Sequence, residues 1–357
     1  MTSRPFALVV ELDGHGAHPA AWHADGRTTR GLLRGARVAE TVRAAERAGF
    51  TAATFEDAPL APGLSHGARV DAVQRAAFAA PLTSAIGLIP VTHAVYAEPF
   101  HLATQLATAD FASSGRAGWI VGVDPDARIA ASSGREPVDA AQAAADASAT
   151  VEVARRLWDS WEDDAAIRDT ASWRYLDRER VHYIDFEGES FSVKGPSIIP
   201  RPPQGQLPII ADASAGVPAD VALVASSANA TVSAARAAGA GLVWLELEVA
   251  LDHAGLTGAE RVARLDAHEP WAVGPFGRYL GDAAGLVELL TGLLGQVDGV
   301  RLRPAVLDED LDELGRAVLP ALRRAGAHTP PAVGATLRES LGLPASVNRY
   351  STKAVTA

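Results

Sequence analysis

The sequence predicts an α/β fold, a (β/α)8 barrel formed by a single domain over residues 1–357. Short runs of strand-forming residues recur along the chain, and most are followed by a longer alanine-rich stretch with helical spacing, which is typical of repeated βα units. Eight strand candidates can be placed, and 48% hydrophobic residues suffice for one large core. A doubly wound nucleotide-binding sheet is disfavoured, because the glycines of residues 13–16, which follow the first strand, do not lead directly into a helix.

The first half of the chain supplies four of the predicted strands. Residues 6–12 form the first, an apolar run that we expect to be buried on both faces. Leu33, Val38 and Val42 share one face of a helix over 32–49, which ends at Gly49 because glycine readily adopts the left-handed conformation of a helix C-cap. The remaining elements of this half are strands at 51–56, 84–92 and 118–123 and helices at 99–111 and 140–161.

The second half continues the alternation less regularly. It contains predicted strands at 208–213, 230–234, 242–248 and 299–303 and predicted helices at 219–225, 286–294 and 308–324. The last of these helices begins with the acidic run 308–310, which the positive end of the helix dipole stabilises. Together with the first half, these segments complete the eight strands of the barrel.

A long excursion separates the fourth helix from the fifth strand. Residues 162–205 are too many for an ordinary βα loop and contain five aromatic side chains. Residues 181–191 have the pattern of a β-hairpin with its turn near Gly188. We expect the excursion to lie over the barrel mouth or to contact another subunit, and residues 344–357 to form a C-terminal tail that docks on the protein and ends loosely.

The composition excludes several classes of function. The formal net charge of −11 has the wrong sign for a protein that holds the phosphate backbone of a nucleic acid. The absence of cysteine excludes disulfides, thiolate metal sites and a cysteine nucleophile. Every stretch of 18 residues has polar interruptions, and residues 1–5 lead into an apolar run too short for a secretory signal. We therefore expect a cytoplasmic protein without a membrane partner.

The working residues of a (β/α)8 barrel lie at the carboxyl ends of its strands. The predicted strands lead into Glu11, Asp13, Glu56, Asp57, Thr92, His93, Asp124 and Asp212. Crowded carboxylates repel one another, which raises the pKa of some of them and suits proton transfer. A metal-dependent hydrolase is an alternative, because His15, Glu56 and His93 could approach one point. A loop on the substrate side explains the same residues, and we predict no metal.

A series of ordered motifs resembles one known family. The motifs are Ala45-Glu46-Arg47-Ala48-Gly49-Phe50, Glu98-Pro99-Phe100-His101-Leu102-Ala103, Gly115-Arg116-Ala117-Gly118-Trp119, Leu157-Trp158-Asp159-Ser160-Trp161, Pro200-Arg201-Pro202-Pro203-Gln204-Gly205, Thr336-Leu337-Arg338-Glu339-Ser340 and Asn348-Arg349-Tyr350. They occur in the same order from residue 45 to residue 350. The chain resembles the bacterial-luciferase-like flavin-dependent monooxygenases, in particular the branch that contains the nitrilotriacetate and dibenzothiophene-sulfone monooxygenases.

The resemblance implies a two-component monooxygenase. Such an enzyme binds reduced FMN supplied by a separate flavin reductase, forms a flavin hydroperoxide with O2, and oxygenates a small organic substrate. It also implies a homodimer. The residues that would take catalytic roles are His15, Trp22 and His93, and those that would contact the flavin are Asp57, Thr92, Asp124, Asp212 and Ser214.

Several positions depart from the family's pattern where it contacts the flavin. The polar run at the end of the fourth strand is replaced by a segment with Ile120 and Val123, a tyrosine that reaches the phosphate is replaced by Ala144, and the segment after the fifth strand ends at Gly216. One alternative is that rearranged contacts hold the flavin, such as Ser214 and backbone N–H groups at a helix N-terminus. The other is a flavin-free barrel that acts as a non-catalytic partner subunit or binds a small molecule.

Overall fold

A closed barrel of eight parallel strands forms the centre of the protein, as the sequence predicts. The computed structural model describes residues 5–25, 29–57 and 69–351. In order around the barrel, the strands are β1 (Ala7–Glu11), β2 (Ala52–Phe55), β3 (Gly87–His93), β4 (Trp119–Gly122), β7 (Ile209–Asp212), β8 (Val221–Val224), β9 (Leu242–Leu251) and β11 (Gly299–Pro304). A further parallel strand, β10 (Gly277–Gly281), pairs with the end of β9 outside the barrel.

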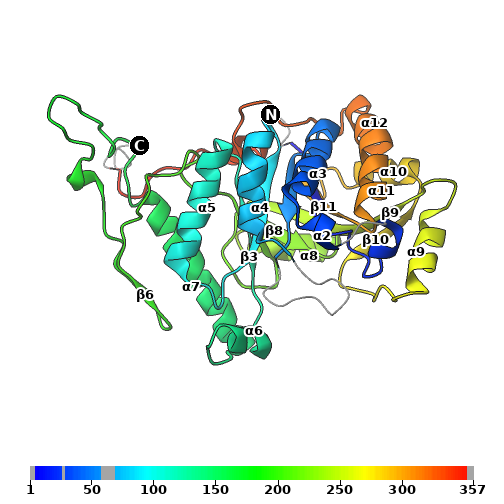
Figure 1. The fold of residues 1–357 in the computed structure, drawn as a ribbon, viewed down its shortest axis with the longest axis horizontal. Coiled ribbons are helices and arrows are strands. Elements are labelled where there is room, and N and C mark those ends of the chain that lie inside the picture. The colour runs from blue at the N-terminus through cyan, green and yellow to red at the C-terminus, as the bar shows by residue number, and fades with distance from the viewer. Residues whose placement is uncertain (1–4, 26–28, 58–68, 352–357) are drawn as a thin grey trace.

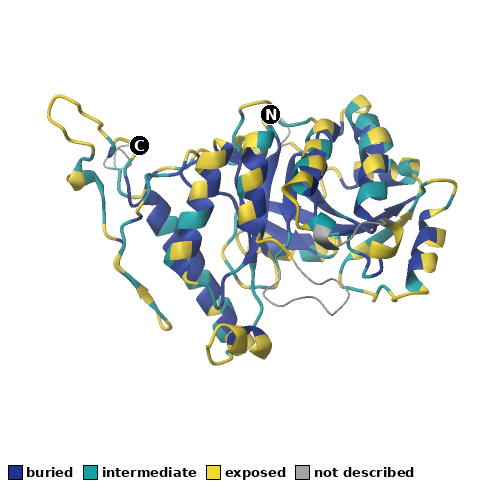
Figure 2. Cartoon of the chain, viewed as in Figure 1, coloured by how far each residue is buried: buried dark blue, intermediate teal, exposed yellow. Residues whose placement is uncertain are grey.

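Helices surround these strands, with their exposed faces turned outward (Figures 1 and 2). Those after the first, second, third and later strands are α3 (Gly35–Ala48), α4 (Ala72–Ala79), α5 (Pro99–Ser113), α7 (Ala140–Asp159), α8 (Asn229–Ala237), α9 (Gly258–Asp266), α10 (Ala283–Gly292), α11 (Leu307–Glu313) and its continuation α12 (Leu319–Arg324). The remaining ones are α1 (Trp22–Asp25), α2 (Thr29–Leu32), α6 (Ala127–Ser132) and α13 (Leu337–Ser340). Gly49 ends α3 with a φ of 89°, which confirms the predicted C-cap. In the described ranges, no helix has the length and apolarity needed to span a bilayer.

The predicted helix at 219–225 and the predicted strand at 230–234 are wrong, because the two elements occur in the reverse order. β8 occupies the first segment, where all four of its residues are buried and pair with β7 and β9. α8 occupies the second, with Val232 and Ala235 buried and most other side chains exposed. Alanine-rich stretches suit either element, and burial on both faces, typical of a parallel strand, decided the assignment of β8.

The connection between β7 and β8 contains no helix. Residues 213–220 join the two strands directly, whereas parallel neighbours usually need a crossover of about a dozen or more residues with a helix. α7 packs beside this connection instead. Arg155 Nη2 lies 3.1 Å from Asp220 Oδ2, and Ser148 Oγ donates to the Gly216 carbonyl at 3.3 Å. Among the described residues, the barrel therefore lacks one of the helices that the (β/α)8 pattern predicts.

The amino-terminal end of the barrel is filled by apolar side chains and closed by α13. The inward residues of the strands form one buried cluster with Leu337 and Leu341 of this helix. The Leu337 side chain packs into the barrel end against two glycines, Gly87 at the start of β3 and Gly118 just before β4. A β-carbon at Gly87 or Gly118 would lie 2.6 Å or 2.9 Å from the Leu337 methyl carbons, so only glycine leaves room for the leucine.

The excursion projects beside α5 and α7, away from the barrel strands (Figure 1). It contains a hairpin of β5 (Phe186–Glu187) and β6 (Ser192–Val193), as predicted, and a short 3-10 helix, η2 (Arg178–Arg180). Many residues of the excursion are exposed (Figure 2), and Trp173 is 94% exposed. The aromatic residues of this segment therefore do not all pack within the chain.

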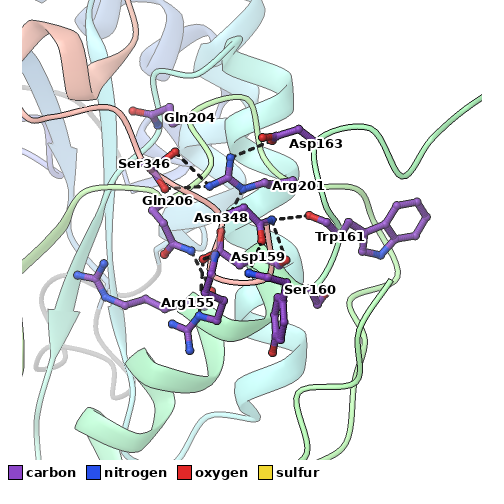
Figure 3. A network of polar contacts seen from close by, with 12 residues as sticks. Arg155, Asp159, Ser160, Trp161, Asp163, Arg201, Gln204, Gln206, Ser346 and Asn348 are labelled. Atoms are coloured by element: carbon purple, nitrogen blue, oxygen red, sulfur yellow. Dashed lines mark hydrogen bonds and ion pairs between the residues drawn. The ribbon is translucent and has the colours of Figure 1, made fainter. Parts of the chain in front are cut away.

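A polar network fixes the base of the excursion to the C-terminal segment (Figure 3). The Arg201 guanidinium lies 3.0 Å from the Asp159 carboxylate and donates to the Ser346 hydroxyl at 3.0 Å. Asn348 Nδ2 donates to the Asp159 backbone carbonyl at 2.9 Å. The end of α7, the return of the excursion and the C-terminal segment are thus held at one point, while residues 352–357 of the predicted tail lie outside the described residues.

Replacing Leu337 by alanine should lower the free energy of unfolding by about 2–5 kcal/mol, because it leaves a cavity at the closed end of the barrel. Leu343→Ala is the matched control, since Leu343 is only partly buried at the edge of the same cluster. Urea denaturation of both variants measures the difference. An equal loss in the two variants would show that α13 does not close the barrel core.

Candidate functional site

Arg301 lies at the centre of an ion-pair cluster in the carboxyl-terminal half of the barrel. Its partners come from β1, from β9 and from the end of β2, and the pairing of the strands brings these side chains to one level. The guanidinium donates to Glu11 at 2.8 Å, to Glu246 at 2.5 Å and to the Thr54 hydroxyl at 3.1 Å. It also contacts Glu56. Arg301 is almost completely buried, so this part of the barrel is filled by paired charges.

Arg303 adds a second cation to the cluster, and its Nε donates to Glu11 at 2.9 Å. Three carboxylates thus share two guanidiniums. Burial raises the pKa of Glu11, but the charges of Arg303 and Arg301 outweigh burial, and its pKa lies below the ordinary value. The pKa of Glu56 is raised, because burial outweighs the attraction of Arg301 and the charge of Glu11 adds repulsion. Glu56 therefore protonates more readily than Glu11.

These arginines correct the expectation of a mouth dominated by mutually repelling carboxylates. Asp13, also expected to belong to that group, lies 2.7 Å from Arg75 and 2.6 Å from Arg69. Sequence reasoning missed Arg301 and Arg303 as site residues. Their spacing could have indicated such a role. Arg301 and Arg303 are two residues apart on one strand, and residues with this spacing share a face of the sheet.

A cavity of about 330 Å³ opens beside the carboxyl ends of β2 and β3. Three of the predicted site residues, Asp57, Thr92 and His93, line it. Thr92 Oγ1 and His93 Nδ1 are buried and have no hydrogen-bond partner among the described residues. Leaving a buried polar group unpaired costs about 1–3 kcal/mol, so each of these atoms has an unused hydrogen-bonding capacity in a residue that lines the cavity.

The rest of the cavity wall combines apolar side chains with polar ones, among them Tyr96, Gln105 and Ser133. Val73, Leu102 and Ile129 provide apolar surface. Asp71 and Glu98 also line the cavity, and each caps the helix that follows it, α4 and α5 respectively. In the sequence, Glu98 belongs to a family motif and has no assigned role. Its role as an N-cap follows from the structure, in which backbone N–H groups of α5 donate to its carboxylate.

Two of the three predicted catalytic residues lie elsewhere. Trp22, 38% exposed, contacts His23 with ring centroids 3.6 Å apart and ring planes tilted by 31°, and His23 in turn stacks on His268 at 3.9 Å. His15 is buried, and its backbone carbonyl accepts from the Leu307 amide at 2.7 Å. Neither Trp22 nor His15 lines the cavity that holds the third, His93.

The remaining predicted flavin contacts occupy a third place, at the ends of β4 and β7. Asp212 Oδ1 accepts from the Ser214 amide at 2.7 Å and from the Ser214 hydroxyl at 2.5 Å. Asp124 accepts from the Asp126 amide at 3.0 Å. Residues 213–220 contain no helix, so the segment that carries Ser214 does not itself provide the expected helix N-terminus.

The structure does not bring together the residues considered as a metal centre. Across the described part of the chain, no three histidine or carboxylate side chains are arranged to hold a metal ion. His15, Glu56 and His93 thus do not converge, and the Glu56 carboxylate is bound to Arg301 instead.

Replacing Arg301 by methionine should lower the free energy of unfolding by about 3–5 kcal/mol at pH 8, because it strands buried carboxylates without a partner. Arg316→Met is the control, since Arg316 is exposed and surface ion pairs contribute about 0–1 kcal/mol. Without Arg301, the folded-state pKa values of Glu11 and Glu56 rise above their unfolded-state values. Such a carboxyl group lowers the stability of the folded protein as the pH rises from the unfolded-state pKa through the folded-state pKa. The loss should therefore be smaller at pH 5, as urea denaturation at both pH values will show. Equal effects of R301M and R316M would contradict the central role of the cluster.

Comparison with known proteins relates this geometry to one family. A family model described as luciferase-like monooxygenase matches residues 17–249. N-acetyl-S-(2-succino)cysteine monooxygenase of Bacillus subtilis (strain 168) is 41% identical over 138 residues, which are 38% of this chain and 31% of that protein. Nitrilotriacetate monooxygenase component A of Aminobacter aminovorans is 39% identical over 140 residues, 39% of this chain and 31% of that protein. The matched part of the chain thus spans about a third of the length of these curated relatives.

A solved structure covers nearly the whole chain. EDTA monooxygenase from Chelativorans sp. BNC1 superimposes with a TM-score of 0.83 over 96% of this chain and 99% of that chain, at 21% sequence identity. At this identity the likeness supports the barrel fold alone. The family model covers more than half of the sequence. The resemblance found in the sequence motifs is thereby confirmed, and the chain belongs to the luciferase-like monooxygenase family.

Proposed function

We propose that the chain is the oxygenase component of a two-component flavin-dependent monooxygenase. It would take reduced FMN from a separate flavin reductase and use O2 to oxygenate a small organic substrate. Membership of the family supports flavin chemistry, and the cavity at the ends of β2 and β3 supports its location. The observation that carries the proposal is the pair of buried atoms without a partner in the described structure, Thr92 Oγ1 and His93 Nδ1.

The cavity fits the ring system of a flavin. One edge of that ring carries carbonyl oxygens and an N–H group, for which a hydroxyl and an imidazole nitrogen are suitable partners. The apolar wall of Val73, Leu102 and Ile129 suits the hydrocarbon part of the ring. A volume of about 330 Å³ lies within the range of small-molecule sites. Asp57, at the same cavity, is proposed as a further contact.

The residues of the chain would orient the reactants and control protons. Reduced flavin, when bound, supplies the electrons with which one oxygen atom enters the substrate and the other leaves as water. Thr92 would fix the ring by a hydrogen bond, and the apolar wall would exclude water from it. His93 Nδ1 can accept or donate a proton at the cavity, and Glu56 can hold one at the barrel mouth. His15 and Trp22 remain proposed residues of a substrate-side loop.

We also propose that the chain forms a homodimer and works in the cytoplasm, where a reductase would supply reduced flavin. Exposed aromatic side chains on two adjacent helices, Phe78 of α4 and Phe111 of α5, support a subunit contact.

A second function is favoured by one specific observation. The donors of Ser214 are engaged by Asp212, and no helix follows β7 in the described structure. A barrel without these anion contacts would also suit a flavin-free partner subunit or a small-molecule binder. That function requires that flavin does not bind, so the same titration separates the two.

Anaerobic titration should show that reduced FMN binds with micromolar affinity, and Thr92→Val should weaken binding roughly 3- to 10-fold, because one hydrogen bond contributes about 0.5–1.5 kcal/mol. Thr108→Val is the matched control. Its hydroxyl is on the exposed side of α5 and donates to the Thr104 carbonyl. Calorimetry gives the dissociation constants. Absence of binding by the unmodified chain would favour the flavin-free barrel.

A further inference from the structure

Carboxylate side chains occupy the helix N-termini that surround the cavity. Four consecutive helices begin around the ends of β2, β3 and β4, and each has a carboxylate at its N-cap: Asp71 for α4, Glu98 for α5, Asp126 for α6 and Asp139 for α7. Each carboxylate accepts a backbone N–H of its own helix. A helix N-terminus binds phosphate through these same N–H groups and its positive dipole. The N-terminus of each of these four helices is therefore already occupied by a carboxylate of the protein itself.

The strand ends next to the cavity add further negative charge. His93 of β3 is level with Gly122 of β4, and the pairing of Val121 with Ala211 places Asp212 level with Gly122 on β7. Two strand spacings, about 10 Å, thus separate the cavity residue His93 from Asp212. This distance is comparable to the length of the ribityl chain that links a flavin ring to its phosphate. Asp124 lies just beyond the end of β4, between the two.

In the described structure, the cavity wall and the first turn of α6 offer no free cation. The cavity has no lysine or arginine among its described lining residues. Arg128, on α6, is bound to the Asp126 carboxylate, with Nε 3.0 Å from each of its oxygens. The missing helix after β7 removes another set of N–H donors, and Ala144 of α7 presents only a methyl group 3.7 Å from where a β-carbon on Gly216 would lie.

We propose that this chain recognises the flavin by the flavin's ring and uncharged ribityl chain, and makes no favourable contact with the phosphate of FMN. Riboflavin would then bind at least as tightly as FMN. The carboxylates of Asp124 and Asp212 repel a phosphate dianion but accept hydrogen bonds from the hydroxyl groups of a ribityl chain. This inference rests on the proposed flavin-dependent function, and it specifies which form of the cofactor the site accepts.

The test is anaerobic calorimetry of the full chain with reduced FMN and with reduced riboflavin, each at about 20 mM and 200 mM salt. Reduced riboflavin should bind with equal or up to roughly tenfold higher affinity. FMN binding should strengthen at the higher salt, because salt screens the repulsion, whereas riboflavin binding should not change. FMN that binds tenfold or more tightly than riboflavin would overturn the inference and leave the proposed function standing. Failure of both flavins to bind would overturn the proposed function and the inference with it.

Two variants locate the effect. Asp212→Asn and Asp124→Asn should each raise the affinity for reduced FMN roughly threefold and leave riboflavin within twofold, because each removes a charge and keeps the side-chain shape. Glu288→Gln is the control, since it removes one exposed carboxylate from α10. Thermal melting of each variant verifies that it is folded. Equal FMN affinities in all three variants and the unmodified chain would show that these carboxylates do not face the phosphate.

Discussion

The guanidinium of Arg301 determines what the inside of this barrel can hold. Carboxylates from neighbouring strands meet at the carboxyl-terminal level of the interior, and each would be strongly destabilising if buried alone. Arg301 binds three of them, and Arg303 reinforces one. The side of the barrel formed by β11, β9, β1 and β2 is therefore occupied by paired charges. The ends of β2 and β3, beyond this cluster, leave a cavity lined by Thr92 and His93, each with an unpaired polar atom in the described structure.

The other side of the barrel is built on a shortened connection. Eight residues, 213–220, replace the helix that would join β7 to β8. The barrel still closes, because β8 pairs with β7 on one side and β9 on the other, and because α7 packs beside the connection through Arg155 and Ser148. The fold is thus preserved while a set of helix N-terminal donors is lost. In a barrel enzyme such a loss changes the ligand more than the stability, since the site is made of the segments that follow the strands.

The same local interactions stabilise the helices and set the charge around the candidate cavity. The acidic N-caps stabilise α4, α5, α6 and α7, an ordinary structural role that each performs through backbone N–H groups. Because these helices begin around one cavity, the same caps also set its electrostatic character. The cavity has no lysine or arginine among its described lining residues, which agrees with the proposed preference for riboflavin over FMN.

The sequence by itself determined the barrel, seven of its eight strands, the hairpin of the excursion and the family, because hydrophobic periodicity and ordered motifs are local signals. It also predicted Asp57, Thr92 and His93, which the structure places together. Only the tertiary structure decided that 221–224 is a strand, since burial on both faces is not visible in an alanine-rich segment. It alone separated Trp22, Asp212 and Ser214 from that cavity and paired the carboxylates with Arg301. Which side chains meet at a barrel mouth depends on strand register and on the paths of distant loops, and these long-range contacts leave no periodic trace in the sequence.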